Sequence, residues 1–495
     1  METIKKIILI IILIPFAGFS QDYFYKKYRS VSSFNEGYGI TQLPDSTYAV
    51  TGMSGGFDEH SSQAFLMLVD KMGEQIWTKS YGGAGDDIGV RVFHVENEGF
   101  YIAGYSSSTL NGDYDFMVIK TDESGNTDWI KYYGTGNWEI LRDAQILADG
   151  GLILVGETVG VTTNGKDGYM ARIDASGSVV WEKSVGIHLD EVIYAVDTIN
   201  TNMDFVVGGV FADVVEENLI GTVIRFDSNG NEVWRHRFEQ AGEKETAIHS
   251  IDIAVDTIYA FGDVYFPTED YRASASLKLS VNGDFYLSHN SHYVTGETQY
   301  TAAVFRDEFG IYAAWQSTAD ELTPYSGGFD AYITRLEFNL NYYNASAGFS
   351  GIGNDIINQL IVTLDDGIAF VGTASDREDD SGGSYNQLLG TVVMIGKLDS
   401  TDQHISNQLG DLGDLVSTVE EQINTVKIYP NPTSYKINLP PELNHLDYKV
   451  MNAQGQIVLD GQIQEEIEVA NLTNGLYFLI IKDDQRIWTG KFLKE

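Results

Sequence analysis

Acidic residues recur in this chain at a nearly constant interval, and carboxylates placed in this way could together bind a cation or a polar ligand. Successive members are 52, 52, 54, 52 and 58 residues apart: Asp87, Glu139, Glu191, Glu245, Glu297 and Asp355. In a circular array of repeated units, these side chains would form a ring near one mouth of a central channel. The same regularity fits equivalent structural hydrogen bonds between units. We favour this second interpretation, because a binding site usually breaks the symmetry of a repeat.

Other residue types that do chemistry occur here without the spacing that a site needs. The nine histidines form no His-Glu-x-x-His motif, and the one close pair, His289 and His292, lacks a third zinc ligand. The chain has no Gly-x-Ser-x-Gly elbow, no phosphate-binding loop and no cysteine. We therefore expect no catalytic residue, no bound metal and no cofactor. Calcium in acidic, glycine-containing loops such as 111–115 is the alternative to ordinary turn chemistry.

The elements that would position these residues repeat about every 52 residues. Four tryptophans mark the period: Trp77, Trp129, Trp181 and Trp234. An apolar run ends in a glycine in most units, as at Gly104 and Gly156, and an Asp-x-x-Gly turn such as 122–125 follows the next apolar run. A period of this length predicts small units that are stacked or arranged around an axis.

Each unit contains four short runs of strand-like sequence separated by turns, which predicts a four-stranded antiparallel sheet. No long window repeats apolar residues at helical spacing. We therefore predict an all-β fold, with a seven-bladed β-propeller over residues 21–399. The last unit lacks its fourth strand, and residues 23–28, which resemble 129–133, would supply it and close the ring. A linear solenoid, the alternative, does not explain this mismatch between the two ends.

Residues 1–20 have the pattern of a secretory signal peptide. Lys5 and Lys6 precede an apolar run, and the small residues Gly18 and Ser20 mark a cleavage site. The run is shorter than the roughly 20 residues that span a bilayer, and no later segment is apolar enough. We expect no membrane span once the signal peptide is removed. The net charge of −40 repels nucleic-acid phosphates, so we expect no nucleic-acid partner.

The C-terminal part of the chain has a different character. Residues 400–425 contain several carboxylates, no Lys or Arg, and none of the repeat markers. We predict an acidic, solvated linker there. From residue 426 onward, short alternating runs between turns predict a small Ig-like β-sandwich over residues 426–495.

Four motifs of this last segment, at 428–432, 451–455, 472–478 and 490–495, resemble the type A C-terminal sorting domain of type IX secretion cargo. The motif residues are Tyr429, Pro430, Asn431, Pro432, Gly475, Tyr477, Gly490 and Lys491. The resemblance implies export from a Bacteroidetes-type bacterium, recognition by the type IX secretion machinery, and a secreted or outer cell-surface location. The repeats resemble, more loosely, the secreted propellers that often carry this domain.

These features favour a non-enzymatic binding or adhesion scaffold at the cell surface. The resemblance to type IX cargo implies release or attachment to surface lipopolysaccharide, so surface polysaccharide or lipopolysaccharide is a candidate partner. Aromatic side chains near the loops could stack on sugar rings or, alternatively, anchor the blades. These aromatic residues are Trp138, Tyr265, Phe266, Tyr271, Trp315 and Tyr325. The alternatives are an extracellular glycan-active enzyme with its site at the channel mouth, and a structural envelope component. An asymmetric cluster of His, Arg, Tyr and carboxylate at that mouth would favour the enzyme, and the repeats reveal none.

Overall fold

The structure, a computed structural model, describes residues 24–28, 34–398, 422–425 and 428–494, with gaps in several loops and turns of these ranges. The described residues contain thirty-five β-strands and no α-helix, which confirms the all-β prediction. None of them belongs to a helix that could cross a membrane. The predicted signal peptide and most of the predicted linker lie outside the described residues.

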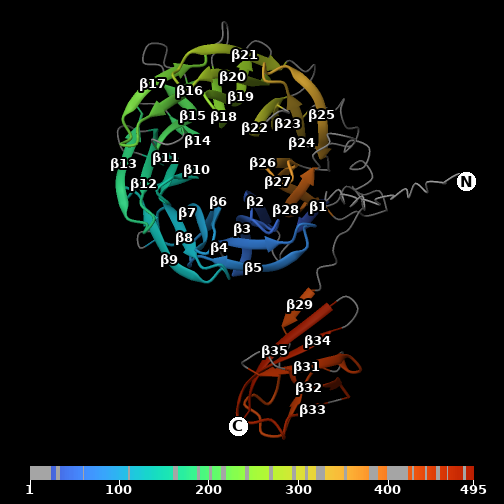
Figure 1. The fold of residues 1–495 in the computed structure, drawn as a ribbon. Coiled ribbons are helices and arrows are strands. Elements are labelled where there is room, and N and C mark those ends of the chain that lie inside the picture. The colour runs from blue at the N-terminus through green and yellow to red at the C-terminus, as the bar shows by residue number, and fades with distance from the viewer. Residues whose placement is uncertain are drawn as a thin grey trace, which may run out of the picture.

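Four-stranded antiparallel sheets follow one another around a ring (Figure 1). We call each sheet a blade and name it by its first strand, which lies innermost in the ring. The β6 and β10 blades contain β6 (Asp87–Val95), β7 (Gly99–Ser106), β8 (Asp115–Thr121), β9 (Thr127–Tyr133), β10 (Glu139–Ile146), β11 (Leu152–Val159), β12 (Lys166–Ile173) and β13 (Val179–Val185). The β14 and β18 blades contain β14 (Val192–Ile199), β15 (Asp204–Ala212), β16 (Leu219–Phe226), β17 (Glu232–Arg237), β18 (Glu245–Ala254), β19 (Thr257–Phe266), β20 (Tyr271–Ser280) and β21 (Phe285–Ser291).

The remaining strands of the ring bring the two ends of the repeat region together. The β22 blade contains β22 (Thr298–Arg306), β23 (Gly310–Ser317), β24 (Asp330–Leu336) and β25 (Tyr342–Phe349). One eight-stranded sheet holds β2 (Phe34–Gln42), β3 (Tyr48–Asp58), β4 (Ser61–Val69) and β5 (Gln75–Tyr81) together with β26 (Asp355–Val362), β27 (Ile368–Arg377), β28 (Leu388–Leu398) and β1 (Phe24–Tyr28). A single parallel pair, Phe34 with Thr391, joins its two halves.

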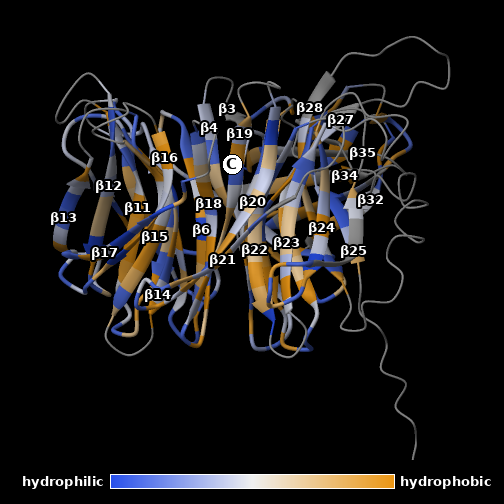
Figure 2. Ribbon diagram, turned by 90° about the horizontal axis from the view of Figure 1, so that it is seen from above, coloured by the Kyte–Doolittle hydropathy of each residue, from blue (hydrophilic) through white to orange (hydrophobic). Residues whose placement is uncertain are grey.

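The core lies between neighbouring blades, because each central strand is buried on both faces. Every described side chain of β7 except Tyr105 is buried, and Tyr101 and Phe116 pack against Leu154 and Tyr169 of the next blade. The recurrent glycine is required by close backbone approach, since a Cβ on Gly104 would lie 1.8 Å from the carbonyl oxygen of Ile88. Figure 2 shows apolar stretches along the strands of the ring.

The tryptophans of the repeat lie on the outer strands and contact the turn of the following blade. A Cβ on Gly125 would lie 2.9 Å from the ring of Trp77, and one on Gly177 would lie 2.7 Å from that of Trp129. These glycines have φ near +73° and +74°, which a Cβ would also disfavour. The Asp-x-x-Gly turns are therefore shaped to receive an aromatic ring from the preceding blade.

The N-terminal strand closes the ring, as the sequence predicted. β1 pairs with β28 in antiparallel register, from Phe24 with Lys397 to Tyr28 with Val393. Phe24 takes the place that tryptophan occupies elsewhere, because a Cβ on Gly73 would lie 2.6 Å from its ring. The Tyr28 hydroxyl donates to the Gly73 carbonyl oxygen, as the Tyr81 hydroxyl does to that of Gly125 at 2.8 Å.

The C-terminal domain forms a five-stranded and a two-stranded sheet around its own apolar core. Its strands are β29 (Gln422–Thr425), β30 (Lys436–Asn438), β31 (Asp447–Asn452), β32 (Ile457–Gln462), β33 (Glu466–Glu468), β34 (Gly475–Lys482) and β35 (Arg486–Lys494). The first strand of this domain begins before residue 426, the domain boundary predicted from the sequence. β29 lies within the segment expected to be linker and pairs in parallel with β35, whose edge would otherwise be unpaired.

Candidate functional site

The structure places the six recurrent carboxylates at the same end of the inner strands. Asp87, Glu139, Glu245 and Asp355 are the first residues of β6, β10, β18 and β26. Glu191 and Glu297 directly precede β14 and β22. Asp87, Glu139 and Glu191 are fully buried and Asp355 is 2% exposed, whereas the side chain of Glu245 is 50% exposed.

Two of these carboxylates, Asp87 and Glu139, accept hydrogen bonds within their own blade. Asp87 accepts hydrogen bonds from the hydroxyls of Ser106 at 2.5 Å and Ser108 at 2.8 Å. The Glu139 Oε1 atom accepts from Thr135 and Thr158, both at 2.6 Å. Among the described residues, no group of three or more His, Asp or Glu side chains could hold a metal ion. Asp87 and Glu139 thus each connect a loop to a strand end.

Some of these carboxylates face a second one. A Cβ on Gly134 would lie 2.3 Å from both Asp115 Oδ1 and Glu139 Oε2, so the two side chains share the space that the glycine leaves. Burial, and then the charge and hydrogen bond of Glu139, raise the pKa of Asp115 to about 6. Burial raises the pKa of Asp355 to about 7, with Asp330 adding to the rise and Lys27 opposing it. These pairs gain a proton more readily than exposed carboxylates.

A β-bulge interrupts the pairing of every innermost strand at the same position. The register skips one residue in each of these strands: Tyr38, Val90, Arg142, Tyr194, His249, Thr301 and Asn358. A bulge leaves its extra residue out of the ladder and re-aims the side chain. All of these residues except Val90 retain exposed surface. The bulges thus place a variable set of side chains along the inner wall.

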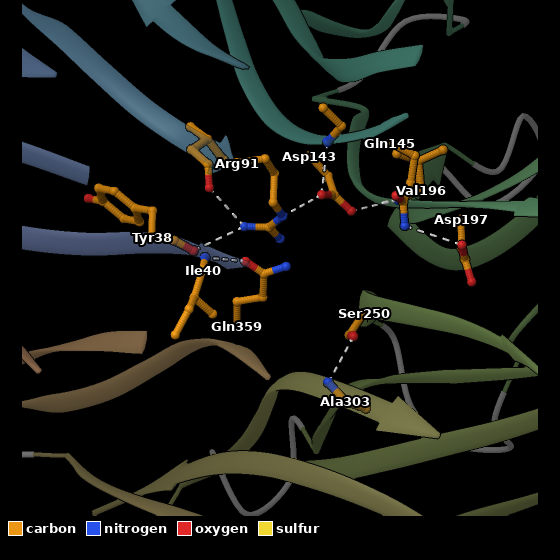
Figure 3. A network of polar contacts seen from close by, with 12 residues as sticks. Tyr38, Ile40, Arg91, Asp143, Gln145, Val196, Asp197, Ser250, Ala303 and Gln359 are labelled. Atoms are coloured by element: carbon orange, nitrogen blue, oxygen red, sulfur yellow. Dashed lines mark hydrogen bonds and ion pairs between the residues drawn. The ribbon is translucent and has the colours of Figure 1, made fainter. Parts of the chain in front are cut away.

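Beyond the bulges, polar side chains of one blade bind the backbone of the next. Arg91 Nε donates to Asp143 Oδ1 at 2.7 Å, and Asp143 Oδ2 accepts from the Val196 amide at 2.9 Å (Figure 3). Ser250 accepts from the Ala303 amide at 3.0 Å, and Gln359 from the Ile40 amide at 2.8 Å. These contacts hold adjacent inner strands together, and we assign them a structural role.

A cavity of about 440 Å³ opens where the β14 and β18 blades meet, on the side of the recurrent carboxylates. Val192, Val210 and Leu219 supply apolar wall, beside the ring of Tyr194. Its remaining lining is Lys166, Asp190, Glu245, Thr246, Ala247, His249, Asp263, Arg272 and Gln299. The volume is in the range of roughly 300–1,000 Å³ that is usual for small-molecule sites.

The charged side of this cavity is formed by acidic and basic side chains that are paired with one another. His249 Nε2 lies 2.5 Å from Asp263 Oδ1, and Arg272 Nη1 lies 2.6 Å from Asp263 Oδ2. Arg272 Nη2 also lies 3.2 Å from Glu245 Oε2. The Asp263 side chain is 1% exposed; burial alone would raise its pKa, but the hydrogen bond and charge of His249, together with Arg272, hold that pKa below its ordinary value. An ionised, buried carboxylate therefore orients two basic side chains toward the cavity.

This asymmetric cluster was not predicted, because the sequence of the repeats reveals none at the channel mouth. Its members lie on three strands, and only the register of β18, β19 and β20 brings His249, Asp263 and Arg272 together. The close histidine pair cannot be placed, because His292 lies outside the described residues.

The described loop aromatics mostly contact other side chains. Phe266 stacks on Tyr271 with ring centroids 4.9 Å apart, and Trp315 stacks on Tyr332 at 4.4 Å. Arg272 lies over the Tyr265 ring, 5.3 Å from its centroid. Trp138 is 52% exposed, with its indole N–H donating to Asp113 at 3.1 Å. Tyr325 lies outside the described residues.

The motif residues of the C-terminal domain meet at its last strand. Asn431 donates from Nδ2 to the Lys491 carbonyl oxygen at 3.0 Å and accepts from the Leu493 amide at 2.9 Å. Tyr477 is buried, stacks on Phe492 and donates to the Thr473 carbonyl oxygen at 2.8 Å. Tyr429, which forms a bridge with Asn438, is 55% exposed. The motif thus fixes the position of β35 and leaves one aromatic ring on the surface.

Residues 427–495 match the family model of the secretion system C-terminal sorting domain. The chain carries a type IX sorting domain. The sorting domain directs the protein to the cell surface or the extracellular space, and it implies recognition by the type IX secretion system. The resemblance noted in the sequence is thereby confirmed for the C-terminal segment.

No curated protein matches the chain. Solved structures with a similar fold include the Pan2 WD40 domain of Neurospora crassa, at 11% identity and a TM-score of 0.46, with 76% of this chain and 96% of that chain covered. The β-propeller domain of the trilobed protease from Pyrococcus furiosus has 10% identity and a TM-score of 0.42, with coverage of 75% and 97%. PorZ of Porphyromonas gingivalis, a surface component of the type IX secretion system, has 9% identity and a TM-score of 0.26, with coverage of 92% and 74%.

Proposed function

We propose that the chain is a seven-bladed β-propeller, sorted by an Ig-like C-terminal domain, that binds a ligand non-enzymatically at the mouth of its ring. The separate four-stranded sheets and the two halves of the eight-stranded sheet support this blade count. The cavity between the β14 and β18 blades is the binding site. Its ligand is compact, with an apolar face for Tyr194 and the aliphatic wall and with polar groups for the charged side.

The observation that carries the proposal is the mutual pairing of the charged groups in the cavity. Asp263 is bonded to both His249 and Arg272, so its carboxylate is engaged on both oxygens. The lining contains no serine or cysteine, and the hydroxyl of Thr246 already donates to the Phe238 carbonyl oxygen at 2.9 Å. Such a site offers oriented donors and acceptors, and its lining holds no serine or cysteine nucleophile for His249 to activate.

The alternative is an extracellular glycan-active enzyme at the same site. It is favoured by one observation, the short contact between His249 and the buried Asp263, since a carboxylate that orients an imidazole is a usual arrangement of a general base. The two functions differ in what the imidazole does: a binding site uses it as a hydrogen-bonding group, whereas an enzyme needs it to take up a proton.

Binding of the full chain to a glycan array, beside a hydrolase screen on the same glycans, tests the proposal. We expect binding without product, a large loss of binding in Tyr194→Ala, and little loss in Tyr38→Ala, the matched change at the bulge of the β2 blade. Product formation that His249→Gln abolishes would establish the enzyme instead. Equal binding by the Tyr194→Ala and Tyr38→Ala proteins would place the site elsewhere.

A further inference from the structure

A second cluster of paired charges lies on the β10 blade, outside the cavity except for one shared residue. Arg142 Nη2 lies 2.9 Å from Glu157 Oε1, and Lys166 Nζ lies 3.3 Å from the same oxygen. The Glu157 side chain is 3% exposed, whereas Arg142 and Lys166 are 39% and 40% exposed. A buried carboxylate again holds two basic side chains at the surface, and Lys166 also lines the cavity.

This cluster occupies the positions of the cavity cluster, two blades earlier. Glu157 and Asp263 each follow the recurrent glycine of the second strand and pair with Gly168 and Ser274. Lys166 and Arg272 each lie two residues before that pairing partner. Arg142 and His249 are both bulge residues. The two clusters are thus equivalent triads, each made of a bulge base, a buried acid and a third-strand base.

The β14 blade between them has apolar residues at the same three positions. Tyr194 is its bulge residue, Val210 takes the place of the acid, and Leu219 takes the place of the third-strand base. Burial raises the pKa of Tyr194, and after burial the groups that act on it are Arg142 and Glu157 from one side and Asp263 and Arg272 from the other. The phenol therefore lies within electrostatic reach of both triads.

We propose that the two triads and the apolar surface between them form one site for a short neutral oligosaccharide. The inference rests on the proposed binding function and names its ligand class. A sugar ring has an apolar face that packs on an aromatic side chain, and hydroxyls that both donate and accept. The triads together supply both kinds of partner, since their bases donate and Glu157 Oε2 accepts.

One buried atom supports a hydroxyl-bearing ligand in particular. Glu157 Oε2 is buried and has no hydrogen-bond partner among the described residues, although its Oε1 serves both bases. A buried acceptor without a partner is costly, and a ligand O–H would satisfy it. An anionic ligand offers no donor there, so the unfilled position favours hydroxyls over carboxylates.

The charges of the site and of the chain also favour a neutral ligand. Each triad combines bases with an acid, so the site carries little net charge. A chain with a net charge of −40 repels anions, and the exposed ends of Arg142, Lys166 and Arg272 repel cations. The ligand extends beyond the cavity, because Arg142 and Glu157 lie past its edge on the side of Lys166. We therefore infer an oligosaccharide and not a single sugar.

Titration calorimetry of the full chain with neutral and acidic oligosaccharides of matched length tests this. We expect the neutral series to bind, and Arg142→Gln and Glu157→Gln each to weaken binding about tenfold or more, as the loss of one charge-assisted hydrogen bond would. Thr301→Ala, at the equivalent bulge of the β22 blade, is the control and should change affinity less than about twofold. Arg142 is partly exposed, so the Arg142→Gln protein should fold and can test the site even if the Glu157→Gln protein does not fold.

The outcomes separate this inference from the proposed function. Binding that is lost in Tyr194→Ala but kept in Arg142→Gln would retain the cavity as the site and overturn the two-triad site. Tighter binding of the acidic series, weakened by salt, would overturn the neutral ligand. Absence of saccharide binding by the parent chain would overturn both proposals.

Discussion

At the scale of single residues, the carboxylates at the strand ends combine two properties that exposed acids lack. Most of them are wholly or partly buried, and several lie beside a second carboxylate. Burial raises the pKa of Asp355 to about 7 and that of Asp115 to about 6. A raised pKa means that the folded chain binds these protons more tightly than the unfolded chain does. Their contribution to stability is fully present below the ordinary carboxyl pKa and is lost as the pH rises toward 7.

The substitution Asp355→Asn should therefore flatten the dependence of stability on pH. We expect the variant to match the parent near pH 3, below the ordinary carboxyl pKa, and to be more stable at pH 8 by about 1–3 kcal/mol, because the amide carries no charge to bury. Urea unfolding at both pH values measures this. Asp45→Asn is the control, since hydrogen bonds from Thr47 hold the pKa of that exposed group below its ordinary value. A variant with the parental slope would show that Asp355 is ionised in the folded protein without cost.

At the scale of elements, the outer strands join the blades through one repeated contact, an aromatic ring over a turn glycine. Lys131, two residues after Trp129, adds a hydrogen bond of 2.7 Å to the Ser176 carbonyl oxygen of the next turn. In β1 the corresponding lysine, Lys26, lies 2.7 Å from Glu74. The strand that closes the ring thus makes the same contacts as the strands inside the repeat.

Phe24→Ala should cost about 3 kcal/mol of unfolding free energy, close to the cost of Trp129→Ala, because each removes a large ring from a packed turn. Thermal and urea unfolding of both variants would measure the cost. Ile76→Ala, on an outer strand with its side chain 51% exposed, should change stability little. If the Phe24→Ala protein unfolds at the same temperature and urea concentration as the parent, β1 does not hold the ring closed.

The repeat itself made the sheets and the closing strand predictable from sequence. The backbone of the blades needs a tryptophan, a glycine and a turn at fixed places, as at Trp129, Gly104 and 122–125. The spacing of these residues therefore predicts the order of the strands. The cavity was not predictable in this way. His249 and Asp263 are fourteen residues apart in the sequence, and they meet because a bulge shifts the register by one residue. The period of the repeat does not reveal the bulge, and the side chain at the bulge varies among the blades.

At the scale of the whole molecule, the ring and the sorting domain have separate apolar cores. The last strand, β35, lies inside the C-terminal sheet, between β29 and β34. Asn431 of the Pro-Asn-Pro motif bonds to its backbone from the other end of the domain. A change at the very end of the chain therefore affects the whole sorting domain while leaving the contacts of the ring intact.

Removal of residues 490–495 should leave the ring folded but hold the protein in the periplasm. Limited proteolysis of the retained protein would show the folded ring, and fractionation would show where the protein resides. A fusion of residues 400–495 to a foreign secreted protein should reach the surface in a host with the translocon, and the matched fusion of 400–489 should not. Export of the truncated fusion would contradict a role of the last strand in sorting.

The bulge that recurs in every inner strand has a further consequence. Because the extra residue stands outside the ladder, its identity is uncoupled from the hydrogen bonds that hold the sheet, and Tyr, Val, Arg, His, Thr and Asn all occur there. Mutation can therefore exchange the lining of the ring one blade at a time while the scaffold stays the same. Such a scaffold can acquire a new specificity without first losing its fold, which makes these positions the natural ones to randomise in a library.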